Sequence, residues 1–407
     1  MAMIQRMQQQ QLNLQVTTVL GLEELLKEEL EDLGIRDLQQ AYGVVHLTGT
    51  WDSAAMILLK SRIGSRVMVS IAEFAARHQA MVYSQVRRID WPKWFSPNQT
   101  FSVRVCGDFS KTDIPRTFAP LKIKDAICDE FRKRVGARPS VARHNPDVPI
   151  VAFFRKGRCE ISLDLSGDPI HRRGYRVDTG TAPIREHRAA ALLRYLGYDG
   201  QRPFVDPFCG AGTIAIEAAM IATGRPPGLL RNPDQYTVFN FSEPGRLAVE
   251  NAWNEAEKQT YPKPAHKIEG RDIDPECIDQ SRSNAERAGL SDLIELHVAN
   301  AKEIEAPHSD IVCNPPYGER MEDTDQAIEL LQDFTSRVKD KCPGSRLALV
   351  LPHGPMTRAT GLKADRRLPV ESAPLELRFM KFSIFHEKSI PITETSRRGT
   401  RKRFEKD

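Results

Sequence analysis

The sequence has no Cys-x-x-Cys pair, and its seven cysteines lie scattered along 407 residues. An odd number of isolated cysteines argues against a disulfide framework and offers no zinc-ligand spacing, so we expect reduced thiols and no metal site. No stretch approaches the roughly 18–20 apolar residues that a membrane span needs. No apolar run follows the glutamine-rich start, Met1–Gln11, so we expect no secretory signal. These absences predict a cytoplasmic protein without a membrane partner.

Positive charge is clustered, although the net charge is only +4. Between Pro115 and Arg143, eight lysines and arginines stand against three acidic residues. The stretch Arg397–Asp407 carries six basic and two acidic residues. Clusters of this kind suit a polyanionic partner. For Arg397–Asp407, a solvated flexible tail with no partner is an equally good interpretation.

The first half of the chain shows two small α/β patterns. The first has strands near Leu14–Val16, Val44–Leu47 and Arg66–Ile71, and leucine-striped or apolar helices near Leu22–Leu33 and Trp51–Ile63, and it ends near residue 75. The second has an alternating strand at Phe101–Val105, a basic helix at Leu121–Val135 and a hairpin spanning Ile150–Leu165. A glycine- and proline-punctuated link then leads to Pro183, where the pattern changes.

The second half alternates strands with helices. Strands are predicted at Pro203–Pro207, Lys267–Asp272, Ile294–Val298, Ile311–Cys313 and Arg346–Leu351, and helices at Arg185–Leu196, Thr213–Ala222, Glu276–Ala288 and Asp325–Val338. This alternation predicts a doubly wound parallel sheet. Leu375–Phe385 is a late strand with no helix after it, and we expect it at an antiparallel edge.

A strand, a glycine-rich turn and a helix follow one another in Asp206-Pro207-Phe208-Cys209-Gly210-Ala211-Gly212-Thr213. The two glycines permit a tight turn and let a ligand approach the main chain. A dinucleotide fingerprint is the alternative, because Gly210–Ala215 also matches G-x-G-x-x-A. A dinucleotide site requires an acidic residue at the end of a strand about 20 positions later. In that region Asn232–Asp234 resembles a loop and not a strand end. Asp206 instead sits where an acid can bind the amino group of a methionine moiety.

Two further strand ends carry polar residues. In Asp272-Ile273-Asp274-Pro275, Asp274 fits a helix N-cap with Pro275 at the first helical position, which leaves Asp272 for ribose hydroxyls. The alternative is that Asp272 is itself only a cap. Asn300 ends the following strand, where a polar side chain can read an adenine amino group.

The tetrapeptide Asn314-Pro315-Pro316-Tyr317 directly follows the strand Ile311–Cys313. Its prolines hold the backbone extended and remove two N–H donors, so the local surface is rich in acceptors, chiefly the Asn314 side-chain oxygen and the Pro315 carbonyl. Two acceptors that hold the hydrogens of an exocyclic amine free its lone pair for attack on a methyl group. Tyr317 offers a face for an extruded base. The alternative is a proline-rich turn with a buried tyrosine.

Other reactive side chains are weaker candidates. Cys209 and Cys313 flank these motifs without a nearby base in the sequence, so packing is the better interpretation. His353 follows the strand Arg346–Leu351 and is a lone histidine.

These motifs resemble those of Rossmann-type amino methyltransferases. Asp206–Thr213 is similar to their first motif, and Asn314–Tyr317 to their N-P-P-[YF] motif. With the junction His171–Arg176, the segment Ala182–Glu186 and the extension Gly318-Glu319-Arg320, the chain more narrowly resembles the THUMP-containing RNA methyltransferases, of the type that makes N2-methylguanosine in 23S ribosomal RNA. Such sequences are often labelled N6-adenine-specific DNA methylases, and close relatives act on transfer RNA.

The resemblance implies an α/β protein with a Rossmann-type catalytic domain and an RNA-binding N-terminal half. The implied segments are a ferredoxin-like segment at 10–75, a THUMP domain at 76–170, a methyltransferase domain at 171–390 and a basic tail at 391–407. Asn314, Pro315 and Tyr317 would act in catalysis. S-Adenosylmethionine would bind Asp206, Phe208, Gly210, Gly212, Thr213, Asp272, Ile273, Asn300 and Ala301. RNA would contact Lys122, Lys124, Arg132, Lys133, Arg134, Arg172, Arg173 and Arg176.

Two departures from the family pattern stand out. Asn300 occupies a position where aspartate is commoner, which weakens the expected adenine contact. The segment Gly224–Pro264 is long and proline-punctuated, so we expect an altered nucleoside pocket. Three functions stay open: a guanine-N2 methyltransferase for ribosomal RNA, the same amine chemistry on transfer RNA or on adenine N6, and an inactive RNA-binding assembly factor.

Overall fold

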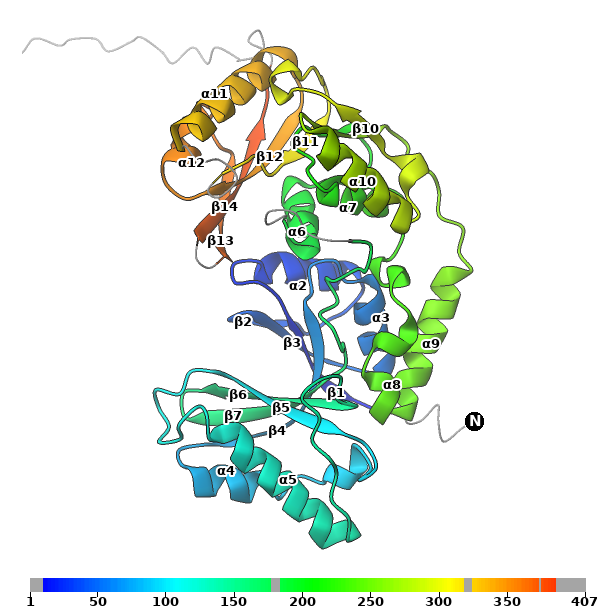
Figure 1. The fold of residues 1–407 in the computed structure, drawn as a ribbon, viewed down its shortest axis with the longest axis vertical. Coiled ribbons are helices and arrows are strands. Elements are labelled where there is room, and N and C mark those ends of the chain that lie inside the picture. The colour runs from blue at the N-terminus through cyan, green and yellow to red at the C-terminus, as the bar shows by residue number, and fades with distance from the viewer. Residues whose placement is uncertain (1–9, 177–183, 318–323, 373–374, 386–407) are drawn as a thin grey trace, which may run out of the picture.

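The computed structural model describes residues 10–176, 184–317, 324–372 and 375–385. Figure 1 shows an N-terminal α/β lobe at the bottom and a second α/β lobe at the top, joined by α2, α3 and α6. Within the described ranges, the named strands form two mixed sheets. The predicted α/β class is therefore confirmed.

The N-terminal lobe is built on one sheet with the strand order β2-β3-β1-β4-β7-β6-β5 in the described residues. Its strands are β1 (Leu12–Thr17), β2 (Gln39–Ala41), β3 (Val44–Gly49), β4 (Arg66–Ala75), β5 (Phe101–Gly107), β6 (Val148–Arg155) and β7 (Arg158–Asp164). β4 pairs antiparallel with β1 along one side and with β7 along the other. The two units that the sequence separates near residue 75 therefore share one hydrogen-bonded ladder.

Helices cover one face of this sheet. They are α2 (Glu23–Asp32), α3 (Trp51–Lys60), α4 (Gln79–Val86), the short η1 (Trp91–Lys93) and α5 (Ala119–Val135). The leucine stripe of α2 is buried at Leu25, Leu26 and Leu30, as its spacing predicts. α4 was not predicted, because its only buried side chains are Val82 and Val86, too few to give a helical pattern.

The second lobe has the strand order β10-β9-β8-β11-β12-β14-β13 in the part of the chain described. Its strands are β8 (Phe204–Asp206), β9 (Ile268–Asp272), β10 (Glu295–Val298), β11 (Asp310–Cys313), β12 (Arg346–Pro352), β13 (Arg366–Ser372) and β14 (Leu375–Ser383). Strands β8 to β12 are parallel, and the order reverses between β8 and β11. The doubly wound sheet is as predicted.

The late strand is antiparallel, but its predicted edge position is wrong. β14 pairs with β12 on one side and with β13 on the other, so β13 forms the edge. The sequence of β13 is rich in arginine and contains Pro369, and it lacks the apolar alternation that marks a strand.

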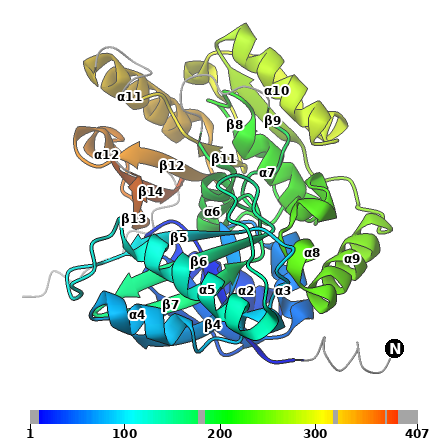
Figure 2. The same ribbon diagram turned by 60° about the horizontal axis from the view of Figure 1, so that its bottom comes forward.

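The helices of the second half lie on both faces of this sheet, except α8 and α9, which pack on the N-terminal lobe. They are α6 (Glu186–Leu196), α7 (Thr213–Ala222), α8 (Val238–Phe241), α9 (Glu243–Glu257), α10 (Pro275–Arg287), α11 (Thr324–Lys341) and α12 (Pro355–Ala359), with short turns η2 (Pro227–Leu230), η3 (Pro233–Gln235), η4 (Ser291–Leu293) and η5 (Ala301–Glu303). α6 and α7 belong to the core that continues into α2 and α3, whereas α11 packs on the opposite side. Figure 2 shows α11 and α12 apart from α7 and α10. None of the described helices is long and apolar enough to cross a membrane.

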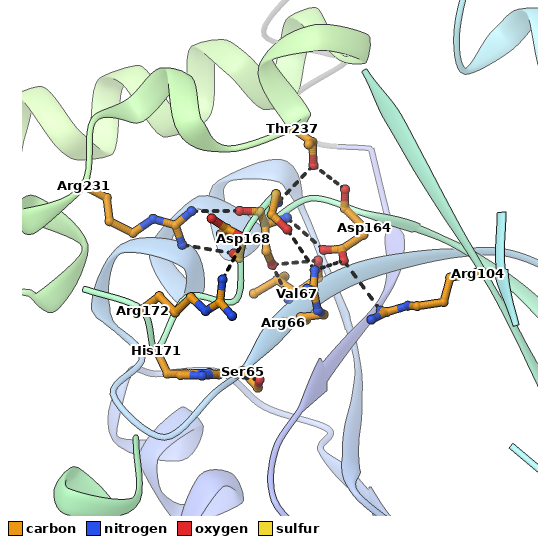
Figure 3. A network of polar contacts seen from close by, with 12 residues as sticks. Ser65, Arg66, Val67, Arg104, Asp164, Asp168, His171, Arg172, Arg231 and Thr237 are labelled. Atoms are coloured by element: carbon orange, nitrogen blue, oxygen red, sulfur yellow. Dashed lines mark hydrogen bonds and ion pairs between the residues drawn. The ribbon is translucent and has the colours of Figure 1, made fainter. Parts of the chain in front are cut away.

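The long segment after α7 binds the N-terminal lobe. α9 packs against α3, and the Tyr236 hydroxyl donates to the Leu58 carbonyl at 3.3 Å. Figure 3 shows Arg231 and Thr237 reaching the chain that leaves β7. Arg231 donates to the carbonyls of Ser166 and Asp168 at 3.1 and 3.2 Å. We refer to residues 224–264 as the clamp segment, because its contacts hold the two lobes together.

Candidate active site

The candidate site lies at the carboxyl ends of β8 and β11. These strands are parallel neighbours, with Asp310 opposite Phe204 and Ile311 opposite Val205. Asp206 ends β8, and Asn314 directly follows β11. Because the strand order reverses between them, the ends of these strands border the crevice in which doubly wound sheets bind ligands.

The glycine turn between β8 and α7 has the backbone that only glycine adopts easily. Gly210 and Gly212 have φ angles of +50° and +78°. A Cβ on Gly210 would meet no atom within 4 Å, whereas a Cβ on Gly212 would lie 3.0 Å from the Ser281 hydroxyl oxygen. The turn therefore presents open backbone at Gly210 and packs tightly against α10 at Gly212.

Two side chains of α10 hold this turn, and neither was predicted from the sequence. The Ser281 hydroxyl donates to the Gly210 carbonyl at 2.6 Å, and the Asn284 amide donates to the Ala211 carbonyl at 2.9 Å. Both side chains are buried. Their i, i+3 spacing beside Ile278 marks the inner face of α10 and is the one signal from which they could have been found.

Asp206 carries a buried oxygen with no partner. The residue is fully buried, and its Oδ1 accepts the Phe208 N–H at 3.2 Å. Its Oδ2 has no hydrogen-bond partner among the described residues. Burial raises the pKa of this carboxyl well above its ordinary range, and the nearby Asp272 raises it further. A buried acceptor of this kind suits a cationic donor from a ligand, such as an ammonium group.

Asp272 ends β9, and Asp274, two residues later, forms the predicted helix cap. Asp274 is the N-cap of α10, because its Oδ1 accepts the Glu276 N–H at 2.9 Å, with Pro275 at the first position. Asp272 accepts the N–H of Gly210 at 2.9 Å through one oxygen and that of Asp274 at 3.1 Å through the other. A carboxylate oxygen accepts more than one hydrogen bond, so Asp272 keeps lone pairs for two hydroxyls.

Residues beyond Asp272 form a partly apolar rim. Ile273 is 68% exposed, and Val298 at the end of β10 is 55% exposed. The Asn300 side-chain oxygen accepts the Lys302 N–H at 3.0 Å and caps η5, so it already has one partner before any adenine is bound. Ala301 is buried below it. Exposed aliphatic side chains beside a carboxylate suit the flat face and ribose of a nucleoside.

Asn314 provides the second buried acceptor of the site. Its side chain is 7% exposed, and its Oδ1 has no hydrogen-bond partner among the described residues. Pro315 is buried next to it. Tyr317 is half-buried and packs against the two apolar clusters on opposite sides of the catalytic sheet. Residues 318–323 lie outside the described part of the chain, and with them Gly318, Glu319 and Arg320. Two unpartnered oxygens, on Asp206 and Asn314, therefore end neighbouring strands.

The cysteines near the site are packing residues. Cys209 and Cys313 are 6% and 0% exposed. Burial raises the pKa of both thiols well above the ordinary range, with the Asp206 carboxylate as a further cause. Neutral thiols are poor nucleophiles. His353, after β12, is exposed and uses its backbone N–H to pair with Glu376.

One of the predicted RNA contacts is wrong. Arg173 is 1% exposed, and its guanidinium pairs with the buried Glu217 of α7 at 3.3 Å and with the Arg62 carbonyl at 2.7 Å. In the motif His171–Arg176, this arginine therefore stabilises the joint between the lobes. The sequence could not reveal this, because Glu217 lies in an apolar helix that gives no hint of a cationic partner.

The neighbouring arginines are placed differently. Arg176 pairs with Glu186 at 3.3 Å and donates to the Thr213 hydroxyl at 2.8 Å, so it reaches the first residue of the glycine-turn helix. Thr213 is 2% exposed. Arg172 has a side chain that is 66% exposed. On α5, the side chains of Arg132, Lys133 and Arg134 are exposed and those of Lys122 and Lys124 half-buried.

The residues around β8, β9 and β11 fit the parts of S-adenosylmethionine. The unpartnered oxygen of Asp206 suits its ammonium, the open backbone at Gly210 suits close approach, and Asp272 suits its ribose. Among the described residues, no group of three or more metal-ligating side chains occurs. The doubly wound fold with this set of strand-end residues defines the Rossmann-type methyltransferase class.

Comparisons with known families give the particular family. A model of the RMKL-like methyltransferase domain matches residues 173–380, and the chain belongs to that family. A THUMP domain model matches residues 78–164, and a model of the RlmL ferredoxin-like domain matches residues 13–68. The chain is therefore a THUMP-containing methyltransferase of RlmL type, as its motifs predict.

Solved structures resemble nearly the whole chain. SMU.472, a proposed methyltransferase complexed with SAH, is 25% identical with a TM-score of 0.84 and covers 93% of this chain and 99% of its own. A possible methylase from Clostridium difficile 630 is 29% identical with a TM-score of 0.81, covering 92% and 98%. A predicted N6-adenine-specific DNA methylase from Listeria monocytogenes is 26% identical with a TM-score of 0.82, covering 92% and 96%.

Proposed function

We propose that this protein transfers a methyl group from S-adenosylmethionine to the N2 amine of a guanine in 23S ribosomal RNA. The observation that carries the proposal is the buried, unpartnered oxygen of Asn314 beside Pro315. The SAH complex of SMU.472 supports the choice of methyl donor. The match to the RlmL ferredoxin-like domain and the THUMP domain supports RNA as the substrate.

The proposed chemistry needs only acceptors at the target amine. Bound S-adenosylmethionine supplies an electrophilic methyl group on a sulfonium. The Asn314 oxygen and the Pro315 carbonyl accept the two N–H bonds of the base amine, which localises its lone pair on nitrogen. The new N–C bond would form as the S–C bond breaks, which would leave SAH, and the methylated amine would then lose one proton to water. Tyr317 provides the face on which the extruded base lies.

The proposed cofactor contacts follow from the strand ends. Asp206 would accept from the ammonium group, and Gly210 and Gly212 would let the methionine portion approach the backbone. Asp272 would accept from the ribose hydroxyls. Phe208, Thr213, Ile273, Asn300 and Ala301 would complete the walls of the site. Because the Asn300 oxygen already caps η5, its contact with adenine would be a second and weaker bond.

The N-terminal lobe would bind the RNA. We propose divisions at residues 75, 170 and 390, with Lys122, Lys124, Arg132, Lys133 and Arg134 of α5 as phosphate contacts together with Arg172. Residues 391–407 lie outside the described part of the chain. Arg173 is not one of these contacts because it is buried, and Arg176 binds Thr213 at the joint between the lobes.

Adenine N6 is the second candidate for the target amine. It presents the same two hydrogens to the same acceptors, and one relative, from Listeria monocytogenes, is described as a predicted N6-adenine-specific DNA methylase. Guanine N2 of transfer RNA is a further substrate of the same chemistry. An inactive assembly factor is disfavoured, because such a protein has no use for two buried acceptors at neighbouring strand ends.

The test compares acceptors and one variant. Purified protein is incubated with methyl-labelled S-adenosylmethionine and unmodified transcripts of 23S ribosomal RNA, transfer RNA or DNA, and the nucleosides are then separated. We expect label in N2-methylguanosine from 23S RNA. Asn314→Ala should lower transfer by about a hundredfold, the effect of losing one preorganised group at a reacting centre.

The control is Asn232→Ala, at an exposed position of the clamp segment, and it should retain full transfer. SAH binding to Asn314→Ala, measured by calorimetry, should stay within twofold of the parent protein. Label in N6-methyladenosine would replace guanine by adenine in the proposal. Absence of SAH binding to the parent protein would favour the assembly factor instead.

A further inference from the structure

A row of arginines extends from the open face of the N-terminal sheet to the candidate active site. The sheet has a trough of about 1060 Å³ on the face opposite α5, and Arg66 and Arg104 line it. The helix side of β6 buries Ile150, Ala152 and Phe154 against α5. Side chains of a strand alternate between faces, so the trough side is the face without helices.

At the edge of the trough, three arginines share two carboxylates. Figure 3 shows Arg66 and Arg104 on either side of Asp164, with Arg172 beside Asp168. Arg66 and Arg104 both pair with Asp164, the latter at 4.0 Å, and Arg172 pairs with Asp168 at 3.5 Å. The side chains of Arg104 and Arg172 are 54% and 66% exposed. Each keeps donors that face solvent.

The row continues through a pair of buried histidines. The ring of His171, next to Arg172, lies 4.2 Å from the ring of His187 in α6. Arg185 directly precedes α6 and is exposed, and its side chain makes no hydrogen bond or ion pair with another described residue. Arg188 follows His187, and its Nη2 donates to the Glu371 carbonyl at 3.2 Å. Arg188 also interacts electrostatically with Tyr317 of the candidate active site.

The histidines report the positive charge of this region. The pKa of His171 is lowered to about 3, chiefly by burial, and then by the charges of Arg173, Arg185, Arg172 and Arg66. Burial lowers the pKa of His187 as well, with His171, Arg188, Arg173 and Arg185 as further causes. The arginines named here all lower the pKa of these two rings. Four arginines of the row, Arg104, Arg66, Arg172 and Arg185, thus stand against the two carboxylates Asp164 and Asp168 with which members of the row form ion pairs.

We propose that Arg104, Arg172 and Arg185 bind successive phosphates of a single-stranded RNA segment, which runs from the trough to Arg188 and Tyr317. Arginine binds phosphate in a bidentate manner, and a row in which arginines outnumber carboxylates attracts a polyanion. A single strand fits because the target base has to leave its stack to reach Tyr317. The inference deepens the proposed function: it assigns Arg104, Arg185 and Arg188 to the substrate path and rests on RNA being the substrate.

The test measures how salt weakens binding of a labelled oligouridine. Each phosphate contact adds about 0.7 to the slope of log affinity against log salt for a single strand. Arg185→Ala and Arg172→Ala should each lower that slope by about 0.7, and the double variant by about 1.4. Arg185→Lys keeps the charge and should keep the parent slope. The control, Arg287→Ala, removes an exposed arginine at the far end of α10 and should change nothing.

The outcomes separate this inference from the proposed function. Unchanged slopes in Arg185→Ala and Arg172→Ala, with parent-like SAH binding, would overturn the phosphate row while leaving the methyltransferase reaction intact. If the variants lower the salt slope equally for double-stranded RNA and for oligouridine, the proposal that the bound segment is single-stranded would be overturned. If no RNA accepts a methyl group but the slopes fall as expected, the row stands and the proposed reaction fails.

Discussion

Asp206 is the residue at which binding and stability oppose each other. Its carboxyl is fully buried with one unpartnered oxygen, and burial raises its pKa. A carboxyl whose pKa is higher in the folded state stabilises the fold only when it is protonated. That contribution is complete below the ordinary aspartate pKa of about 3.9 and is lost as the pH rises through the folded value. At neutral pH the empty site therefore costs stability.

Asp206→Asn should consequently raise the melting temperature and weaken cofactor binding together. The asparagine can still accept the Phe208 N–H but carries no charge for an ammonium group. We expect the affinity for SAH to fall by about 10- to 100-fold, the worth of a charged hydrogen bond. Calorimetry measures the affinity, and thermal melts between pH 4 and 8 measure the stability. A melting temperature that is equal to the parent's across this range would contradict the assignment.

Single residues were predicted correctly where their contacts are with neighbours in the chain. Asp274 and Pro275 follow a capping rule that involves only neighbours in the chain, and the cap is observed. Arg173 failed because its partner, Glu217, lies 44 residues away and fully buried in another helix. A basic motif in sequence gives no sign of whether an arginine meets solvent or a buried acid.

At the scale of elements, the glycine turn depends on α10. Ser281 and Asn284 donate to carbonyls of the turn, and Asp272 accepts from its Gly210 N–H. The turn is thus held on one side while the backbone at Gly210 stays open. These contacts join residues that are about 70 positions apart, and this is why the motif alone did not identify them.

Alanine substitutions at Gly210 and Gly212 should differ in their effect on stability. Gly212→Ala places a Cβ 3.0 Å from the Ser281 oxygen at a φ of +78°, so it should lower both stability and SAH affinity. Gly210→Ala meets open space, so it should cost only about 1–2 kcal/mol of backbone strain while weakening SAH binding. Denaturant unfolding and calorimetry measure the two quantities. A Gly212→Ala protein as stable as Gly210→Ala would contradict the tight packing.

Elements with strong periodicity were predicted, and those without it were not. The striped helix α2 and the parallel strands are present at the expected positions. α4 buries only two side chains and β13 is rich in arginine, so neither gives a pattern that local sequence can reveal. The clamp segment was expected to alter the nucleoside pocket. In the structure it packs on α3 and on the chain after β7, and its Arg225 donates to carbonyls at the end of α10. Such long-range packing leaves no local signal in the sequence.

At the scale of the whole molecule, the lobes share one core. The apolar cluster that contains Leu14 and Leu26 of the N-terminal lobe also contains Leu192 and Ile214 of the catalytic lobe. The clamp segment adds Arg231, which is 4% exposed and stacks its guanidinium 4.6 Å from the Tyr236 ring. The orientation of the arginine row toward the active site therefore depends on this joint.

Arg231→Ala should loosen the joint. It leaves the carbonyls of Ser166 and Asp168 without donors, at a cost of about 1.5–3 kcal/mol for each charged hydrogen bond. We expect faster hydrogen exchange in the clamp segment and a lower melting temperature. Glu255→Ala, at an exposed position of α9, is the control and should stay within about 0.5 kcal/mol of the parent. Equal exchange in the two variants would mean that Arg231 does not hold the lobes together.

The shared strand β4 has a consequence for dissecting this protein. Its Met68–Ala75 edge is paired with β7, which comes about 90 residues later in the chain. A fragment cut after residue 75 would expose that edge as a row of unpaired N–H and C=O groups, and such edges seed intermolecular strand pairing. The ferredoxin-like unit would then aggregate when expressed alone. The boundary near residue 75 that the sequence pattern predicts is therefore not a suitable place to divide the protein. An exchange of RNA-binding modules between relatives has to carry both units together.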